Sequence, residues 1–195
     1  PTFPPIRRRR NNGRDWAIRR KPVALRKAMG ILRGHTPSIR FAEDIVELDA
    51  DWVVGFVDGE GCFHVSLNPH DEISAGYQVL PEFVVVQHER DRQVLMALKR
   101  FFKAGVVRGN HDDRICLRIR KFEALREVCD FFGRHPLKTK KNVDFHKFRR
   151  ILHLMSQRRH LCREGLIEIV DIVLTMNSGN RPVLEEIRRE LIQTG

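Results

Sequence analysis

The sequence has no long apolar run, and no stretch approaches the roughly 18 to 20 residues that a membrane span needs. Its longest apolar helix candidate, Leu166 to Met176, is interrupted by Glu168 and Asp171. No apolar segment of the signal-peptide type follows the basic start, so we expect no secretory signal. These absences predict a protein without a membrane partner.

Closely spaced cysteines are also missing. The sequence contains no Cys-x-x-Cys motif, and its four cysteines are widely scattered: Cys62, Cys116, Cys129 and Cys162. His153 and His160 lie near Cys162 but match no zinc-ligand spacing. We therefore expect a reducing compartment, no zinc site, and cysteines that pack as small apolar groups.

Basic residues are absent from one region and concentrated in two others. Residues 43–89 hold eleven acids and neither Lys nor Arg. Residues 1–42 hold twelve basic residues and one acid, a net charge of +11, and residues 90–163 hold 21 basic and seven acidic residues, a net charge of +14. Such basic segments favour a polyanionic partner, and nucleic acid is the first candidate.

Composition divides the chain at about residue 42. Residues 1–42 contain Pro-Pro, a run of four arginines and little apolar periodicity, which is typical of a flexible basic arm. A solvated leader and an organellar targeting sequence are the alternatives. Residues 43–195 are long enough for one α+β core and form the second predicted domain.

Hydrophobic periodicity predicts helices that alternate with hairpins. A helix is expected over about 42–58, and period-two alternation predicts a hairpin with strands over 62–68 and 77–87. A helix, a second hairpin and another helix follow, over about 90–102, 106–119 and 122–132. This αββαββα order predicts an α+β fold with a four-stranded antiparallel sheet and helices on one face.

Two details complete the predicted fold. Three more helices are expected over about 142–156, 163–176 and 182–192. Pro81 has no N–H group to donate, so it is expected at an edge or bulge of the sheet.

The first predicted helix carries two glycines, Gly55 and Gly59, four residues apart. They share one helix face, where the missing side chains let another backbone approach closely. Asp58 and Glu60 follow at the helix end, within Asp-Gly-Glu-Gly, which we interpret as an exit turn. The sequence therefore puts carboxylates at the edge of a tight helix contact.

The stretch Val54 to Phe63, Val-Gly-Phe-Val-Asp-Gly-Glu-Gly-Cys-Phe, closely resembles the defining motif of the LAGLIDADG homing endonucleases. Phe83 to Gln87 resembles the second strand of that family, and Pro136 to Lys141 with Phe145 resembles its basic loop and following helix. The motif occurs once, which resembles the single-motif, intron-encoded subfamily that acts as a homodimer. The resemblance implies a saddle-shaped sheet and an intracellular setting, in the bacterial cytoplasm or in the stroma or matrix of an organelle.

The resemblance also implies a composite active site. Glu60 occupies the metal-binding acid position, with the carbonyl of Gly59 beside it, and Gln87 and Lys140 match peripheral catalytic positions. Two or three Mg²⁺ ions shared by the dimer are expected, and Mn²⁺ or Ca²⁺ could substitute for binding. The expected dimer interface contains Asp51, Gly55, Asp58 and Gly59.

Simpler interpretations of these residues stay open. Asp58 is interpreted as a hydrogen-bonding residue at the helix end, with direct metal ligation as the alternative. Gln87 could instead cap the next helix, and Lys140 could be a solvated loop charge. Arg90 and Arg92 are weaker candidates for the same pocket.

Alternation places every second strand residue on the face of the sheet that would meet the DNA major groove. Arginine can read guanine there, and Asn or Gln can read adenine. The predicted DNA-binding residues are His64, Ser66, Asn68, His70, Gln78, Glu82, Arg108, Asn110, Arg114 and Arg118, with Lys138 and Lys141 from the basic loop. Each alone could be an ordinary exposed strand residue.

The expected function is metal-dependent cleavage of both strands of a long, partly palindromic DNA site by a homodimer, which promotes intron mobility. The alternative is a non-cleaving protein on the same fold, such as a splicing maturase with intron RNA as its partner. The basic arm is expected to follow the DNA backbone. If about four arm cations contact phosphates, deleting the arm should flatten the slope of log K against log[salt] by about 3.6.

Overall fold

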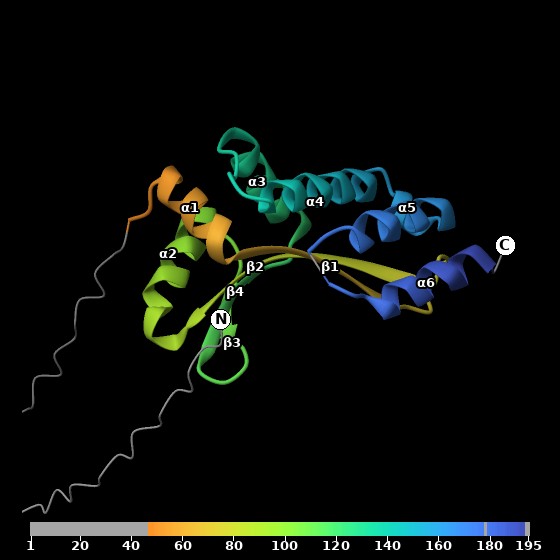
Figure 1. Cartoon of the computed structure of the whole chain (residues 1–195), viewed down its shortest axis with the longest axis horizontal. Coiled ribbons are helices and arrows are strands. Elements are labelled where there is room, and N and C mark those ends of the chain that lie inside the picture. The colour runs from red at the N-terminus through yellow and green to blue at the C-terminus, as the bar shows by residue number, and fades with distance from the viewer. Residues whose placement is uncertain (1–46, 178, 194–195) are drawn as a thin grey trace, which may run out of the picture. The chain divides into compact units, whose positions relative to one another are not determined.

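The structure is a computed structural model that describes residues 47–177 and 179–193 (Figure 1). The predicted basic arm, the boundary at residue 42 and the first residues of the expected motif helix lie outside these ranges. Within them, every helix is too short or too polar to cross a lipid bilayer.

The motif helix α1 spans Ala50–Glu60, so it begins later and ends later than the sequence predicts. It begins at Ala50 because the side chain of Asp49 accepts the N–H of Trp52 at 2.7 Å and caps the first turn. The expected exit turn is wrong, since Glu60 is still helical and Gly61 already belongs to the first strand.

Helix and strand join without a loop because Gly61 has no side chain. Its N–H donates to the carbonyl of Val57, and a Cβ at this position would lie 2.6 Å from Val57 Cγ1 and 2.9 Å from Val57 O. Such distances are shorter than van der Waals contact, so glycine is required at this junction.

Four strands form one antiparallel sheet in the order β1-β2-β4-β3, which confirms the predicted fold class. The strands are β1 (Gly61–Pro69), β2 (Tyr77–His88), β3 (Val106–Gly109) and β4 (Arg114–Ile119). Pro81 lies in β2 opposite Val65 of β1, whereas β4 pairs with β2 only from Phe83 onward. The missing N–H of Pro81 is therefore tolerated, because β2 is locally an edge there.

Helices pack against one face of the sheet. They are α2 (Arg92–Phe102), α3 (Phe122–Arg134) and α4 (Lys141–Ser156), and Figure 1 shows α3 and α4 on the same side of it. Phe63 of β1 is fully buried at the centre, with its ring centroid 5.3 Å from that of Phe83 and 5.5 Å from that of Phe145. Aromatic packing of this kind fixes the position of β1, and with it the end of α1.

The remaining elements follow the predicted order. Two short 3₁₀ turns, η1 (Glu89–Asp91) and η2 (Arg159–Leu161), precede α2 and α5 (Arg163–Leu174), and α6 (Pro182–Gln193) ends the described chain. Figure 1 shows α6 beside the hairpin of β1 and β2, and the Tyr77 hydroxyl donates to Glu190 of α6 at 2.5 Å.

The four cysteines are free thiols. Cys116 and Cys129 are buried as expected, and burial raises the pKa of Cys129 to about 12. Cys162 is exposed, which differs from the expectation that all four pack as apolar groups.

Candidate active site and DNA interface

One surface hollow brings together two of the predicted catalytic residues. Glu60 reaches it as the exposed last residue of α1, and Gln87 reaches it from the end of β2. The hollow is lined by Glu60, Val86, Gln87, His88, Asp113 and Arg114. Residues from the motif helix, from β2 and from the start of β4 therefore meet at one place.

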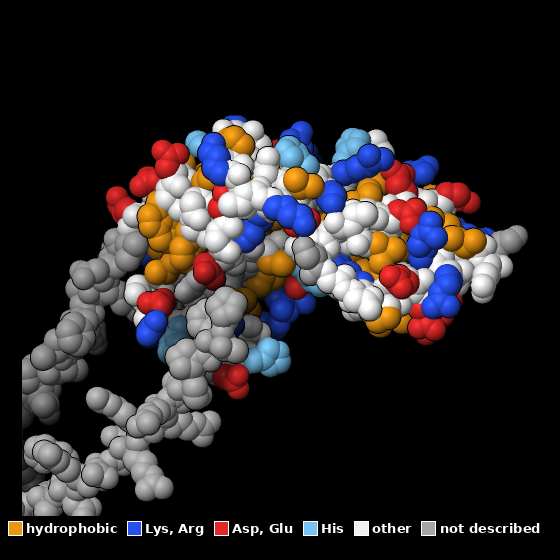
Figure 2. Space-filling model, viewed as in Figure 1, with side chains coloured by type: hydrophobic (Ala, Val, Ile, Leu, Met, Phe, Trp, Pro, Cys, Tyr) orange, Lys and Arg blue, Asp and Glu red, His pale blue; other side chains and the backbone are white. Residues whose placement is uncertain are grey.

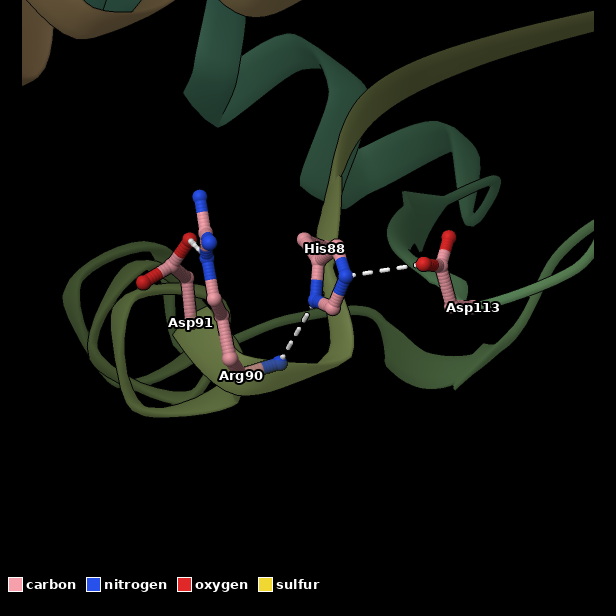
Figure 3. A network of polar contacts seen from close by, with 4 residues as sticks. All are labelled: His88, Arg90, Asp91 and Asp113. Carbon is pink, nitrogen blue, oxygen red and sulfur yellow. Dashed lines mark hydrogen bonds and ion pairs between the residues drawn. The ribbon is translucent and has the colours of Figure 1, made fainter. Parts of the chain in front are cut away.

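His88 fixes the wall of this hollow (Figure 3). Its Nδ1 accepts the backbone N–H of Arg90 at 3.1 Å, and its Nε2 lies 2.8 Å from Asp113 Oδ2. An acceptor role for Nδ1 assigns the proton to Nε2, which then donates to Asp113. The backbone adds a second link, because the N–H of Glu89 donates to the carbonyl of Asp113 at 2.8 Å.

These bonds decide between two interpretations of Gln87. The residue that caps η1 is His88, so the capping role considered for Gln87 is filled by its neighbour. Arg90 and Arg92 make local ion pairs instead: Arg90 with Asp91 at 3.5 Å, and Arg92 with Glu89 at 2.7 Å. Neither arginine lines the hollow.

Asp58 binds the basic loop to the motif helix. Its Oδ2 accepts the N–H of Lys138 at 2.6 Å, and its Oδ1 accepts the Thr139 hydroxyl at 2.7 Å and the Thr139 N–H at 3.2 Å. Partial burial raises the pKa of Asp58, but these hydrogen bonds and the charge of Lys141 lower it more, so the net pKa is below the usual value. Asp58 is thus a hydrogen-bonding residue at the helix end, as the sequence indicated.

The loop also touches the backbone of the motif. Lys141 Nζ donates to the carbonyl of Gly59 at 3.0 Å, and desolvation lowers the pKa of Lys141 despite the nearby carboxylates of Asp58 and Glu60. Lys140 precedes it at the N-terminal end of α4 and is exposed. The backbone of Lys138 and the side chain of Lys141 thus hold the loop beside the end of α1.

The outward face of α1 combines aromatic rings with open glycines. Trp52 is 40% exposed and stacks on Phe56 with ring centroids 4.7 Å apart, and Figure 2 shows hydrophobic side chains exposed over α1. Apart from the backbone of its own helix, a Cβ built at Gly55 or Gly59 would meet no described residue within 4 Å. Asp51 is exposed on the same helix. No packing within the described chain therefore explains these glycines, each of which weakens a helix by roughly 1 kcal/mol relative to Ala.

The predicted DNA-reading residues lie mostly on the sheet face opposite the helices. On β1 the buried residues Phe63, Val65 and Leu67 alternate with the less buried positions that were predicted to read bases. The predicted residues with exposed or half-buried side chains are His64, Ser66, Asn68, His70, Gln78, Arg108, Asn110, Arg114, Arg118, Lys138 and Lys141.

Glu82 differs from the other predicted DNA-reading residues. It is the buried polar residue of the described core, and its Oε2 lies 2.8 Å from Arg120 Nε and 3.4 Å from Arg118 Nε. The carboxylate of Glu82 therefore faces the protein's own arginines, unlike a side chain that points outward to read a base.

Comparison with known proteins identifies the family. The family model described as LAGLIDADG endonuclease matches residues 53–152. The chain belongs to the LAGLIDADG endonuclease family. The crystal structure of the homing endonuclease I-TnaI has 58% sequence identity and a TM-score of 0.73, and the match covers 75% of this chain and 99% of that one.

Other LAGLIDADG proteins match over parts of their length. I-SmaMI bound to uncleaved DNA in the presence of calcium ions has 31% identity and a TM-score of 0.70 over 75% of this chain and 50% of that one. The probable intron-encoded endonuclease 3 of Neurospora crassa is 28% identical over 131 residues, 66% of this chain and 25% of that protein. An uncharacterized 50.9 kDa protein in ND4 intron 1 of Podospora anserina is 25% identical over 141 residues, 71% of this chain and 31% of that protein. The chain thus spans about a quarter to a third of these curated relatives.

Several residues of this LAGLIDADG site were missed from the sequence. His88 and Asp113 line the hollow, Thr139 anchors the loop, and Arg120 pairs with Glu82. His88 directly follows Gln87, which was a usable signal. The other three depend on contacts between distant parts of the chain, which periodicity does not reveal.

Proposed function

We propose that this LAGLIDADG protein is a metal-dependent endodeoxyribonuclease that acts as a homodimer. It cleaves both strands of a long, partly palindromic DNA site inside the cell and promotes the mobility of its intron. The observation that carries the proposal is the hollow that joins Glu60 to Gln87, beside a glycine face that no described residue of the chain packs against.

The donor atoms present fit a hard divalent cation. Mg²⁺ prefers oxygen ligands and commonly binds one or two carboxylates together with phosphate oxygens. Glu60 would supply one carboxylate, and the described residues of one protomer contain no group of three or more His, Cys, Asp or Glu side chains suited to a metal. Two copies of Glu60 with DNA phosphates would complete such a site, which is why the proposal requires a dimer.

Each active-site residue has a distinct role in hydrolysis of the phosphodiester. Bound Mg²⁺ would supply an activated water and stabilise the leaving oxygen. Glu60 would hold the cation, Gln87 would orient water across the hollow, and Lys140 would balance negative charge at the scissile phosphate. The bonds of Asp58 to the loop, and those of His88 to Arg90 and Asp113, keep these groups in place.

The α1 face supports the dimer. Gly55 and Gly59 let a second α1 approach closely, and Trp52 and Phe56 supply the exposed aromatic area that such a contact would bury. A two-fold contact brings equivalent residues together, so two Glu60 carboxylates would lie near the axis. The two reading surfaces would then face inverted half-sites.

The test uses DNA that carries the uninterrupted insertion site of the gene. We expect cleavage of both strands with Mg²⁺, none with EDTA, and retained binding with Ca²⁺. Glu60→Gln should abolish cleavage while DNA binding persists, because it removes the anionic ligand and preserves the shape of the side chain. Cleavage by Glu60→Gln at the wild-type rate would refute the metal site, and binding without cleavage by the wild-type protein would favour a non-cleaving regulator or maturase.

A further inference from the structure

Glu82 lies on the sheet face that we assign to DNA, where an unpaired carboxylate would repel phosphates. It pairs across strands with His64 of β1, and the register of β2 with β4 brings Phe83 opposite Ile119. Arg120 therefore follows directly beside Glu82, and Arg118, opposite Val84, is its diagonal neighbour on the same face. The three charged residues form one cluster, which we call the Glu82 cluster.

In the Glu82 cluster, one buried carboxylate lies between two guanidinium groups. The Glu82 side chain is only 11% exposed, the Arg118 side chain is 22% exposed, and the Arg120 side chain is 57% exposed. Glu82 Oε2 accepts a hydrogen bond from Arg120 Nε at 2.8 Å, and it forms only an ion pair with Arg118 Nε at 3.4 Å. Arg118 Nε is buried and has no hydrogen-bond partner among the described residues. Burying an ionised carboxylate costs free energy, and the positive charges of the two arginines offset this cost for Glu82. Glu82 in turn restricts the side-chain conformations of both arginines.

A hollow next to the cluster is open to a ligand. It is lined by Gly105, Val106, Arg108, Arg118, Ile119, Arg120 and Lys121. Its charged groups are all cations, and its floor is apolar. Such a surface suits the guanine edge in the major groove together with a neighbouring phosphate, since guanidinium can bind O6 and N7 of guanine as a pair.

We propose that Glu82 is a positioning residue for DNA recognition, which fixes Arg118 and Arg120 as one rigid unit that reads guanine at a defined position of the target. The inference rests on the proposed function, because it requires this face to contact DNA. It assigns Glu82 a role through the arginines and gives Arg120, absent from the predicted set, direct contact with bases. Rigid arginines lose less side-chain entropy on binding, and because they cannot move to another acceptor, a mismatched base leaves them unpaired.

The experiment selects binding sites from a randomised DNA duplex library in the presence of Ca²⁺, with wild-type protein, Glu82→Gln and Arg120→Gln. The control is Glu168→Gln, since Glu168 also pairs with two arginines, Arg150 at 2.8 Å and Arg159 at 3.6 Å, but on helical segments outside the proposed reading face. We expect Arg120→Gln to reduce the preference for guanine at particular positions by about tenfold or more.

Glu82→Gln should relax the preference at those same positions and tighten binding to unrelated DNA, because the cluster then carries one more net positive charge. Glu168→Gln should leave every position unchanged. A Glu82→Gln profile equal to that of the wild type, or relaxed uniformly along the site, would overturn the inference alone. No enriched sequence with wild-type protein would overturn the proposed function, and this inference with it.

Thermal unfolding shows whether Glu82→Gln is folded. If it is not, the comparison uses Arg118→Gln and Arg120→Gln, because both side chains are partly exposed and tolerate substitution better. If Arg118 and Arg120 read DNA as one unit, both variants should alter the preference at the same base positions. Separate positions for the two arginines would overturn the proposal.

Discussion

The carboxylate of Asp58 accepts the hydroxyl of Thr139 at 2.7 Å, although the two residues lie 81 positions apart in the sequence. Asp58 stands two residues before Glu60 in α1, and Thr139 directly precedes Lys140. The contact therefore couples the helix that carries the proposed metal ligand to the loop that carries the proposed catalytic lysine.

Thr139→Val should weaken this coupling and leave the DNA-reading surface intact. The Thr139 hydroxyl also accepts the N–H of Lys141 at 3.2 Å, so two hydrogen bonds are lost and we expect the free energy of unfolding to fall by about 1 to 3 kcal/mol. We expect the rate of cleavage to fall roughly 10- to 100-fold, because small displacements of catalytic groups are costly. Denaturant unfolding, single-turnover cleavage and binding in Ca²⁺ separate the three quantities.

Thr139→Ser keeps the hydroxyl and serves as the matched control. It should retain nearly wild-type stability and cleavage. If Thr139→Val cleaves as fast as the wild-type protein, the position of Lys140 does not depend on this bond.

Gly55→Leu should raise the stability of the monomer and abolish the dimer. Leucine is the better helix former by up to roughly 1 kcal/mol, and among residues 47–177 and 179–193 a Cβ at this position meets nothing within 4 Å. In the proposed dimer the same side chain would separate the two helices. Sedimentation should therefore show a folded monomer that has lost cleavage.

The control for this variant is Gly133→Leu on α3, where a built Cβ meets only the guanidinium of Arg149, at 3.7 Å. It should gain similar helix stability while assembly and cleavage stay unchanged. A Gly55→Leu protein that stays dimeric and active would exclude α1 as the interface.

His64 should make the folded state less stable in mild acid. Burial lowers its pKa below the ordinary 6.5, and the charges of Arg181 and Arg118 act in the same direction against the opposing charge of Glu82. As the pH falls below 6.5, the unfolded chain binds more protons than the folded protein, so the free energy of unfolding decreases. His64→Gln should flatten this dependence in denaturant titrations between about pH 5 and pH 7.

His160 provides a second, separate contribution. Its pKa is lowered by burial and by the charge of Arg158. His160→Gln should flatten the same dependence further, and the two effects should add if the sites are independent. An unchanged slope in the double variant would exclude both histidines as its source.

Tyr77 should titrate far above the usual range. The hydrogen bond to Glu190 raises its pKa from 10.0 to about 12, with burial and the charges of Glu190 and Glu186 acting in the same direction. Tyr77 is the single tyrosine of the chain, so an ultraviolet titration reports this residue alone. Because the folded pKa is raised, this contribution is complete below pH 10 and is lost as the pH rises toward about 12.

Glu190→Gln tests the cause of that shift. We expect it to move the tyrosine titration back toward 10, whereas Glu186→Gln should have a smaller effect. A titration that stays near 12 in Glu190→Gln would show that α6 does not hold the hairpin through this bond.

The sequence predicted β1 and β2 well because each has one buried face and therefore alternates over most of its length. β3 has no buried residue, and its position was predicted from the turn that follows it. The prediction was less accurate where a local contact sets the end of a helix. The start of α1 depends on the Asp49 cap, and its end depends on the close approach of Gly61 to Val57, so periodicity misplaced both ends.

The motif residues of the candidate site could be predicted from the sequence, but the contacts that hold neighbouring side chains in place could not. Glu60 and Gln87 come from segments that resemble the family, and the structure brings them to one hollow. The burial of Glu82 arises from Arg118 and Arg120, far along the chain, so alternation assigned the correct face but could not reveal the Glu82 cluster.

The direct passage from α1 into β1 at Gly61 has a consequence for redesign. Because no loop separates α1 from β1, a rotation of the motif helix would move the first reading strand by the same rotation. In the proposed dimer, the angle between the two helices would then set the number of base pairs that separate the half-sites. Gly61 is the place where an inserted residue would alter that spacing while the reading residues stay the same.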